Sequence, residues 1–391
     1  MQYRTFGRLD WRPSALGFGA MRLPILDGDP GKIDEALAAR MIRTAVDHGV
    51  NYFDTAWPYH REQSERFLGR CLRGGDRRRV RIATKLPSPR VATPGDFDRF
   101  LDEQRRRLQT ERIDFYLLHG LNKEHWAKLR GLGVLEWAER VRREGRIGEF
   151  GFSFHDDLAT FREVVDAYDW GFCQIQYNYI DVEFQAGREG LRYAAKRGLA
   201  VVVMEPLRGG SLACPAPREV LALWDSAPRR RSQADWALQW VWNDPDVSLV
   251  LSGMSNLGQV EENLASADRS GVGSLSEDEL SLVERVRNAY RALAPIPCTR
   301  CGYCQPCPHG VAIPRVFTLY NDAMAYGDLA RLGRMYRNAA FVGPESRADQ
   351  CVACGTCEAA CPQQIRIVEW LRKAHGALLS AGETESPPRD G

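Results

Sequence analysis

The sequence predicts an α/β protein, in which residues 1–297 form a parallel (β/α)8 barrel and residues 298–391 form a separate, smaller part. Three observations point to this organisation. Eight short apolar runs alternate with amphipathic stretches along the first part of the chain. The first run is not followed by G-x-G-x-x-G, which weakens the alternative of a doubly wound sheet. Eight of the eleven cysteines fall after residue 297.

The predicted strands are short apolar runs bounded by turn signals. In chain order they are Ala15–Ala20, Asn51–Thr55, Val80–Leu86, Asp114–His119, Ile147–Ser153, Phe172–Tyr177, Ala200–Pro206 and Val247–Ser252. Amphipathic helices are expected between them, with examples at Glu35–His48, Asp96–Leu108, Leu135–Arg143 and Ser232–Trp242. Strand–helix alternation predicts a parallel sheet, and eight such units predict closure into a barrel.

The composition is that of an ordinary globular protein, with 44% hydrophobic and 27% charged residues. The net charge of +2 gives no reason to expect a nucleic acid or an anionic membrane as partner. No apolar run reaches the roughly 18–20 residues that span a bilayer. The start, Met1–Gly7, lacks the apolar stretch of a signal peptide. We therefore expect a cytoplasmic protein without a membrane segment.

A stiff break, Ala294–Pro297, follows the last helical stretch of the barrel, and we place the domain boundary there. The last ten residues, Gly382–Gly391, have almost nothing to bury and are expected to be disordered. This leaves 298–381 as the second domain.

Active sites of parallel barrels lie at the carboxyl ends of the strands. Four side chains that can donate or accept a proton lie at or just after successive strand ends, namely Asp54, Tyr59, Lys85 and His119. Any one of them alone is commonly a capping or packing residue, but the set forms a pattern. A phenol has a pKa of about 10, so it is a poor acid at neutral pH. A nearby ammonium would lower that pKa, and a carboxylate would hold the ammonium in place. Tyr59 could then protonate a carbonyl oxygen while hydride reaches the carbon.

Residues 1–297 resemble the aldo-keto reductases along their length. Asn51–Tyr59 is similar to the family's Asp and Tyr segment, with the same separation between the two residues. Ala83–Lys85 and Tyr116–His119 are similar to its Lys and His segments. Val250–Ser255, together with Glu261–Asn263, resembles its last strand and the segment beside the adenine.

The resemblance implies a catalytic tetrad of Asp54, Tyr59, Lys85 and His119, with Tyr59 as the acid/base. It also implies bound NAD(P)H and reversible reduction of an aldehyde or ketone. By position, Ser153 and Gln174 would hold the carboxamide of the nicotinamide, and Met204 would pack on its ring. The rest of the cofactor would lie against the segments after strands seven and eight, and the residues implied there are Glu205, Leu207, Arg208, Gly210, Gly253, Ser255, Gln259, Glu262 and Asn263.

Some positions depart from the family's common pattern. Phe154 stands where Asn is usual, and Met204 where an aromatic residue is frequent. Many members grip a 2′-phosphate with cationic side chains at the positions of Gly253 and Gln259. Because neither residue is charged, the resemblance does not imply a preference for NADP, although Arg208 could substitute as the cation.

The cysteines after residue 297 form two runs, each followed by Pro. The first is Cys298-x2-Cys301-x2-Cys304-x2-Cys307, and the second is Cys351-x2-Cys354-x2-Cys357-x3-Cys361. The second has the ligand spacing of bacterial ferredoxins, whereas the first is one residue shorter before its last cysteine. Helices are expected between the runs, at Pro314–Met324 and Asp328–Ala340.

In two-cluster ferredoxins the fourth cysteine of each run ligates the other cluster. This predicts one [4Fe–4S] cluster on Cys298, Cys301, Cys304 and Cys361, and a second on Cys351, Cys354, Cys357 and Cys307. Four-thiolate zinc sites are the main alternative. The whole chain resembles the aldo-keto reductases that carry a carboxyl-terminal ferredoxin-type domain. Gly151–His155 and Met204–Gly210 resemble that subgroup's fifth and seventh strands.

Three functions fit these features. The first is an NAD(P)H-dependent oxidoreductase that acts on a small carbonyl substrate and carries two [4Fe–4S] clusters. The second is an electron-transfer or redox-sensing protein whose barrel docks a redox partner protein. The third is a barrel that binds nicotinamide without turnover. The complete tetrad favours the first, because a binding module needs no Tyr–Lys–Asp arrangement.

Overall fold

The computed structural model describes residues 1–298 and 302–381. The predicted ligand Cys301 and the predicted disordered tail from residue 382 onward lie outside these residues. The chain divides into two compact units. The first comprises Met1–Gly210 and Arg231–Leu280, and the second comprises Ser211–Arg230 with the described residues after Leu280. The domain boundary expected after residue 297 stays a prediction.

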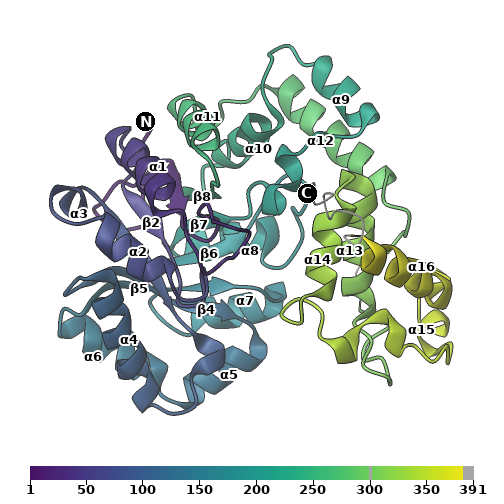
Figure 1. Ribbon diagram of the computed structural model, residues 1–391, viewed down its shortest axis with the longest axis horizontal. Coiled ribbons are helices and arrows are strands. Elements are labelled where there is room, and N and C mark those ends of the chain that lie inside the picture. The colour runs from purple at the N-terminus through teal and green to yellow at the C-terminus, as the bar shows by residue number, and fades with distance from the viewer. Residues whose placement is uncertain (299–301, 382–391) are drawn as a thin grey trace, which may run out of the picture. The chain divides into compact units, whose positions relative to one another are not determined.

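The first unit contains a closed parallel barrel in which each strand pairs with the next and β8 pairs with β1. Figure 1 shows these strands with helices around them. The strands are β1 (Leu16–Gly19), β2 (Tyr52–Asp54), β3 (Arg81–Leu86), β4 (Ile113–Leu121), β5 (Ile147–Phe154), β6 (Phe172–Gln176), β7 (Ala200–Met204) and β8 (Leu249–Gly253). All eight coincide with predicted runs, so the barrel is confirmed and the doubly wound alternative is wrong.

The interior of the barrel is filled by alternate residues of the strands, because successive side chains point to opposite faces. Phe6, from the segment before β1, packs among side chains near the beginnings of β2, β4, β6 and β7, including Tyr52 and Phe115. Its ring lies 5.1 Å from that of Phe115 and 5.4 Å from that of Trp11, centroid to centroid. This aromatic group fills the amino-terminal end of the barrel, which leaves the carboxyl ends of the strands for a site.

The helices of the first unit follow the strands, as the amphipathic stretches predicted. They are α1 (Glu35–Asp47), α2 (Ser64–Cys71), α3 (Gly75–Arg79), α4 (Gly95–Leu108), α5 (Lys123–Gly131), α6 (Val134–Arg143), α7 (Leu158–Asp166), α8 (Gly187–Lys196), α10 (Gln233–Trp242) and α11 (Leu257–Asp268). Helix α1 begins where the Asp34 side chain accepts a hydrogen bond from the N–H of Leu37. Its buried face carries Ala38, Met41, Ile42 and Ala45, which pack in the layer between helices and strands.

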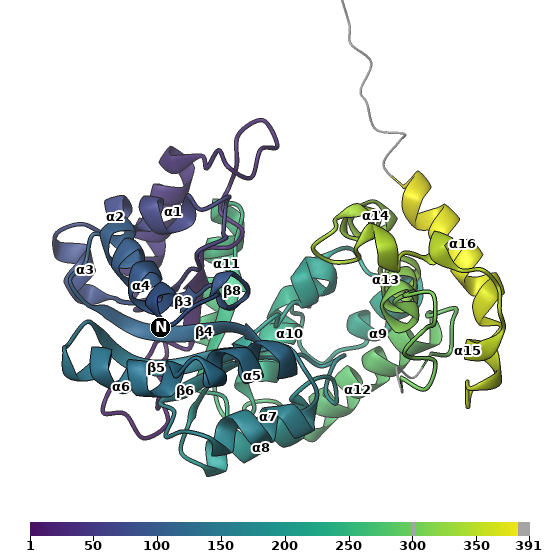
Figure 2. The same cartoon turned by 90° about the horizontal axis from the view of Figure 1, so that it is seen from below.

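The second unit is mainly helical within the described residues. Its helices are α9 (Arg218–Asp225), α13 (Ile313–Tyr326), α14 (Leu329–Arg337), α15 (Thr356–Ala359) and α16 (Ile367–Ser380), and most of α12 (Glu277–Ala292) also belongs to it. Helices α13, α14 and α16 lie side by side in Figures 1 and 2 and bury Val316, Leu332 and Leu371 in one core. None of the helices in 1–298 or 302–381 is both long and apolar enough to cross a bilayer.

Candidate active site

The tetrad predicted from the sequence comes together at the carboxyl ends of β2, β3 and β4. The Lys85 Nζ lies 2.5 Å from Asp54 Oδ1, 2.8 Å from the carbonyl oxygen of Thr55 and 3.5 Å from the Tyr59 hydroxyl. The Tyr59 and His119 rings are 6.0 Å apart and meet edge to face. Asp54 and Lys85 are buried, whereas Tyr59 and His119 are only partly buried. The ion pair is thus shielded, and the phenol and imidazole can reach a bound molecule.

A β-bulge places His119. The register between β4 and β5 shifts between Leu118 and Leu121, and Gly120 within the shift has φ +60°. Bulges of this kind re-aim a side chain at the end of a strand. The N–H of Gly120 donates to the Ser153 hydroxyl at 2.8 Å, which fixes the bulge against β5. Ser153, predicted as a cofactor contact, therefore also supports His119.

Burial and the neighbouring charges set the protonation of the tetrad. Burial lowers the pKa of Lys85, but the charges and hydrogen bonds of Asp54 and Tyr59 together outweigh burial, so the pKa is raised and Lys85 is an ammonium. Burial raises the pKa of Tyr59, and the opposing effect of Lys85 is smaller. Lys85 thus acts on the phenol pKa in the expected direction, and burial determines the net shift. Burial, followed by the charge of Lys85, holds the pKa of His119 well below its usual value, so the imidazole is neutral.

This arrangement can donate protons to an oxygen atom. Tyr59 is a neutral phenol with its proton in place, and a cation 3.5 Å from its oxygen stabilises the phenolate that remains after donation. A neutral imidazole retains one N–H that can orient the same oxygen. Together these groups can act as a general acid, with electrostatic stabilisation of the charge that develops.

Two of the predicted cofactor contacts lie next to each other in the sheet, since Ser153 of β5 is in register with Gln174 of β6. Gln174 is buried, and its Oε1 has no hydrogen-bond partner among the residues that the structure describes. A buried unpaired carbonyl oxygen is costly unless a bound group donates to it. An amide N–H of a carboxamide fits this need.

The segment after β7 contains the next predicted contacts. Met204 is in register with Gln176, and Glu205 adopts φ +56°, which is rare for a residue with a side chain. Leu207 precedes Arg208, whose Nε lies 2.8 Å from Oδ2 of the buried Asp181. This ion pair holds the Arg208 side chain. Asp181 therefore competes with a coenzyme phosphate for the Arg208 guanidinium. Gly210 has φ +98°, a conformation that suits glycine.

The segment after β8 is tied together by its own hydrogen bonds. Ser255 donates its N–H to Gln259 Oε1 at 2.7 Å and its hydroxyl to the carbonyl oxygen of Arg22 at 3.0 Å. Glu262 is exposed. Asn263, predicted as an adenine contact, is buried and donates to the Ser252 hydroxyl at 2.9 Å.

Arg22 is a residue that sequence reasoning missed. Its side chain lies over Gly253: a Cβ built on that glycine would be 3.2 Å from the Cδ of Arg22. Arg22 is exposed and lies three residues after Gly19, the last residue of β1, which pairs with β8. The sequence offered one signal for Arg22, which is that it shortly follows the first predicted strand, at the end of the barrel where sites form. The Arg22 guanidinium group therefore belongs to a side chain that lies beside Gly253, a position that itself carries no charge.

The described cysteines of the two runs lie around two cavities in the second unit. One cavity is lined by Cys304, Cys307, Cys351, Cys354 and Cys357, and the other by Cys298, Cys304 and Cys361. Cys307 thus joins the second run, and Cys361 joins the first. Two left-handed residues shape the second run, Ala353 with φ +59° and Gly355 with φ +76°. Within 1–298 and 302–381, no three His, Cys, Asp or Glu side chains converge on the position of a single metal ion.

Comparisons with known proteins agree with this architecture. A sequence model described as the Aldo/keto reductase family matches residues 15–287, and one described as a 4Fe-4S dicluster domain matches 297–365. The chain is 26% identical to L-galactose dehydrogenase of Arabidopsis thaliana, over 73% of this chain and 94% of that protein. It is 25% identical to pyridoxal 4-dehydrogenase of Microbacterium luteolum, over 68% and 93%.

Among solved structures, the holo form of an aldo-keto reductase from Bacillus halodurans superposes with a TM-score of 0.62 at 26% identity, over 73% of this chain and 96% of that chain. The resemblance inferred from the sequence motifs is thereby confirmed for both parts of the chain. The chain belongs to the aldo/keto reductase family of oxidoreductases and carries a 4Fe-4S dicluster domain after its barrel.

Proposed function

We propose that this chain reversibly reduces an aldehyde or ketone with NAD(P)H, with Tyr59 as the acid/base, and that it carries two [4Fe–4S] clusters. The observation that carries the proposal is the position of the Lys85 ammonium, 2.5 Å from Asp54 and 3.5 Å from the Tyr59 hydroxyl. A protein that only bound nicotinamide would have no use for a buried cation beside a partly exposed phenol.

Reduced nicotinamide, when bound, supplies the hydride that reaches the carbonyl carbon. Tyr59 gives its proton to the carbonyl oxygen, and Lys85 stabilises the phenolate that remains. His119 donates an N–H to the same oxygen and orients the carbonyl. Tyr59 then regains a proton from water, and in alcohol oxidation every step runs in reverse.

The residues that would hold the nicotinamide are Ser153 and Gln174, and the unpaired Oε1 of Gln174 supports this assignment. Met204 would pack against the ring, where a thioether is an adaptable apolar contact. The phosphates and adenosine would lie along Glu205, Leu207, Arg208 and Gly210 and along the segment after β8, in keeping with the usual phosphate site of barrels. Arg22 beside Gly253 would supply the cation on the adenosine side.

The distribution of cysteines around the two cavities supports two clusters with crossed ligation. Cys361 shares a cavity with Cys298 and Cys304, and Cys307 shares the other with the second run. We assign one [4Fe–4S] cluster to Cys298, Cys301, Cys304 and Cys361, and the other to Cys307, Cys351, Cys354 and Cys357. Thiolate ligands of this kind stay available in a reducing compartment, which supports placing the protein in the cytoplasm.

The names of similar proteins bear on the substrate class. They refer to L-galactose, to pyridoxal and, in a rat protein 24% identical to this chain, to an aflatoxin aldehyde. These compounds share a carbonyl or an alcohol that becomes one and differ in the rest of the molecule. We therefore propose a small carbonyl compound as the substrate.

An electron-transfer role remains the second candidate, because the second-run cavity opens at exposed residues. Tyr303 is 70% exposed, Val352 is 60% exposed, and Cys354 is exposed as well. A cluster bound there would be within reach of a redox partner protein. Neither the net charge nor the helices give a reason to add nucleic acid or a membrane to the partners.

The test is anaerobic oxidation of NADPH and NADH by cluster-reconstituted protein with a panel of aldehydes and ketones. We expect carbonyl-dependent turnover that is lost in Tyr59→Phe while cofactor binding is retained. Reconstituted protein that turns over no carbonyl with either cofactor would instead support the electron carrier.

A further inference from the structure

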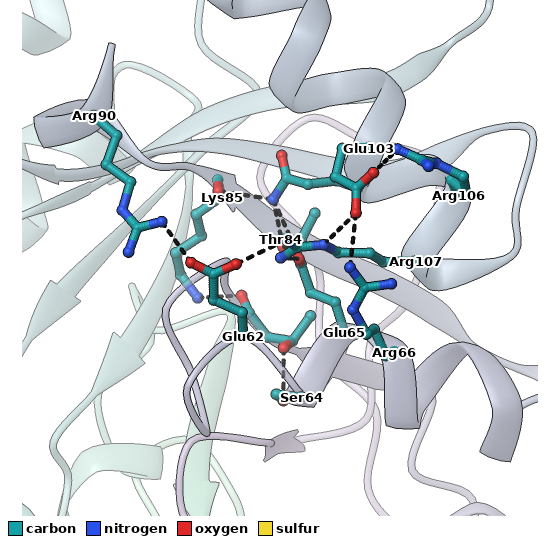
Figure 3. Close-up of polar contacts among 12 residues, drawn as sticks. Glu62, Ser64, Glu65, Arg66, Thr84, Lys85, Arg90, Glu103, Arg106 and Arg107 are labelled. Carbon is teal, nitrogen blue, oxygen red and sulfur yellow. Dashed lines mark hydrogen bonds and ion pairs between the residues drawn. The ribbon is translucent and has the colours of Figure 1, made fainter. Parts of the chain in front are cut away.

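A carboxylate outside the tetrad lies fully buried behind it. Glu65, in the first turn of α2, has no exposed surface, and three donors surround its carboxylate (Figure 3). Thr84 Oγ1 and Gln104 Nε2 each donate to Glu65 Oε1 at 2.6 Å, and Arg107 Nη1 donates to Oε2 at 3.2 Å. A buried charge is tolerated only when it is paired and hydrogen-bonded in this way.

One branch of this network reaches the lysine of the tetrad. Thr84 directly precedes Lys85 in β3, so the hydrogen bond from Thr84 to Glu65 fixes the strand at that point. Gln104 Nε2 also donates to the backbone carbonyl of Lys85 at 3.0 Å. The other end of the Gln104 amide accepts from the Tyr116 hydroxyl at 2.7 Å, so the amide cannot turn freely. The backbone from which Lys85 projects is therefore held by Glu65.

A second branch reaches the tyrosine. The Arg107 guanidinium that pairs with Glu65 lies 3.6 Å from the centroid of the Trp57 ring, two residues before Tyr59. Ser64, the neighbour of Glu65, donates its N–H to the carbonyl oxygen of Tyr59 at 3.3 Å. The Ser64 hydroxyl also lies 2.8 Å from that of Thr55. The loop that carries Tyr59 is thus held from both sides.

Further ion pairs hold Arg107 in place. Its Nη2 lies 2.9 Å from Glu62, and its Nε lies 2.8 Å from Glu103. Glu62 pairs with Arg90 at 2.5 Å, and Glu103 with Arg66 at 2.9 Å. Figure 3 shows these charges alternating in sign around the Arg107 side chain. Because every charge in the group has an opposite neighbour, the guanidinium is fixed against Trp57.

We propose that Ser64 and Glu65, acting through Thr84, Gln104 and Arg107, are positioning residues that set the separation between the Lys85 ammonium and the Tyr59 hydroxyl. The proposal rests on the proposed function of Tyr59 and deepens it. The separation matters because the attraction between Lys85 and a Tyr59 phenolate falls with distance. At an effective dielectric constant of about 20, lengthening the Lys85–Tyr59 separation by about 1.5 Å weakens that attraction enough to raise the pKa of Tyr59 by about one unit.

The first experiment compares the wild type with Glu65→Gln, using NADPH and 4-nitrobenzaldehyde for reduction and NADP with benzyl alcohol for oxidation. The amide keeps one acceptor oxygen but turns a nitrogen toward the donors. We expect the NADPH Kd to stay within about twofold and kcat to fall between about 10- and 100-fold, the effect of a misplacement of about 1 Å. The apparent pKa of the oxidation rate should rise by about one unit. The other groups that bear on Tyr59, namely Asp54, His119 and Glu205, are unchanged in the variant.

Asp114→Asn is the matched control. Asp114 is also a buried carboxylate paired with arginines, Arg77 at 2.8 Å and Arg81 at 3.1 Å, but it lies near the amino-terminal end of β4. The Asp114→Asn variant should be less stable than the wild type, but the pH profile of its oxidation rate should be unchanged. An unchanged kcat and pH profile in folded Glu65→Gln would overturn the proposal, and so would equal changes in Asp114→Asn.

Two further measurements keep the test decisive. If Glu65→Gln does not fold, Thr84→Val removes one donor while leaving the Glu65–Arg107 pair, and the same shifts are expected. If the wild type turns over neither probe, the reductase proposal fails for these compounds, and the crystal structure of the variant decides the positioning role. A Lys85–Tyr59 separation unchanged from 3.5 Å would then contradict it.

Discussion

Lys85 and Asp54 form a buried ion pair with 2.5 Å between Nζ and Oδ1, and their residues are 1% and 3% exposed. Neither charge could be buried alone, because an unpaired ion loses its hydration without compensation. The pair is also the reason that a cation can stand beside Tyr59 in a low-dielectric site. The predictions below follow from this arrangement and from the contacts around it.

Removing the carboxylate should be more harmful than removing both charges. Asp54→Asn leaves Lys85 buried without its counter-ion, so we expect a loss of about 3–5 kcal/mol in the free energy of unfolding. Asp54→Leu combined with Lys85→Met should lose less, while remaining inactive. Urea unfolding of the variants measures the difference. A double variant less stable than Asp54→Asn would contradict the assignment of a mutually dependent pair.

His119 should make stability depend on pH. Its pKa in the folded protein is lowered, so between the unfolded value of about 6.5 and the folded value the unfolded chain binds more protons. Stability from this group is present above about pH 6.5 and is lost as pH falls below it, with a slope of up to about 1.4 kcal/mol per pH unit. His119→Gln should unfold with a shallower pH dependence over that interval. Equal slopes in the two proteins would refute the assignment of a neutral imidazole to folded His119.

Arg22 should govern affinity for the phosphorylated coenzyme. Its side chain lies over Gly253, one of the residues proposed to lie along the adenosine end of the coenzyme. Arg22→Ala should raise the Kd of NADPH by about 10- to 150-fold, since a hydrogen bond to a charged group contributes about 1.5–3 kcal/mol. The Kd of NADH should stay unchanged, and Arg22→Lys should retain part of the NADPH affinity. Equal losses for the two coenzymes in a fluorescence titration would rule out a role specific to the additional phosphate.

Crossed cluster ligation makes a prediction about paired variants. Cys307 and Cys354 line the same cavity, so Cys307→Ala combined with Cys354→Ala should remove one cluster. Iron content after anaerobic reconstitution should fall from about eight to about four atoms per chain. If each run instead held its own cluster, this double variant would damage both, and the iron content would fall towards zero.

The sequence predicted the barrel and the proximity of the four candidate side chains because both depend on local patterns. Each strand is an apolar run short enough to read directly, and residues at the carboxyl ends of parallel strands must meet at one edge. Asp54, Lys85 and His119 therefore came together as expected, and Tyr59 with them through a short loop. The lowering of the Tyr59 pKa by Lys85 was expected from the sequence. The larger rise caused by burial could not be expected, because the sequence does not reveal how deeply a residue is buried.

Contacts between distant segments could not be predicted from the sequence. The partners of Glu65 are Thr84, Gln104 and Arg107, and only the packing of α2 against α4 and β3 joins them. In the same way, the hydrogen bond from buried Asn263 to Ser252 could not be read from its sequence motif. A charged or amide side chain in a helix looks solvent-exposed until its partner is known.

The measurement that tests the central claim most directly is the rate of NADPH oxidation by Tyr59→Phe under anaerobic conditions, with an aldehyde that the wild type reduces. Phenylalanine keeps the ring and removes only the hydroxyl that lies 3.5 Å from Lys85 Nζ. We predict unchanged NADPH binding, intact clusters and a fall in kcat of at least about 100-fold, the lower end of the contribution of general acid catalysis. Turnover within a few-fold of the wild type would contradict Tyr59 as the proton donor.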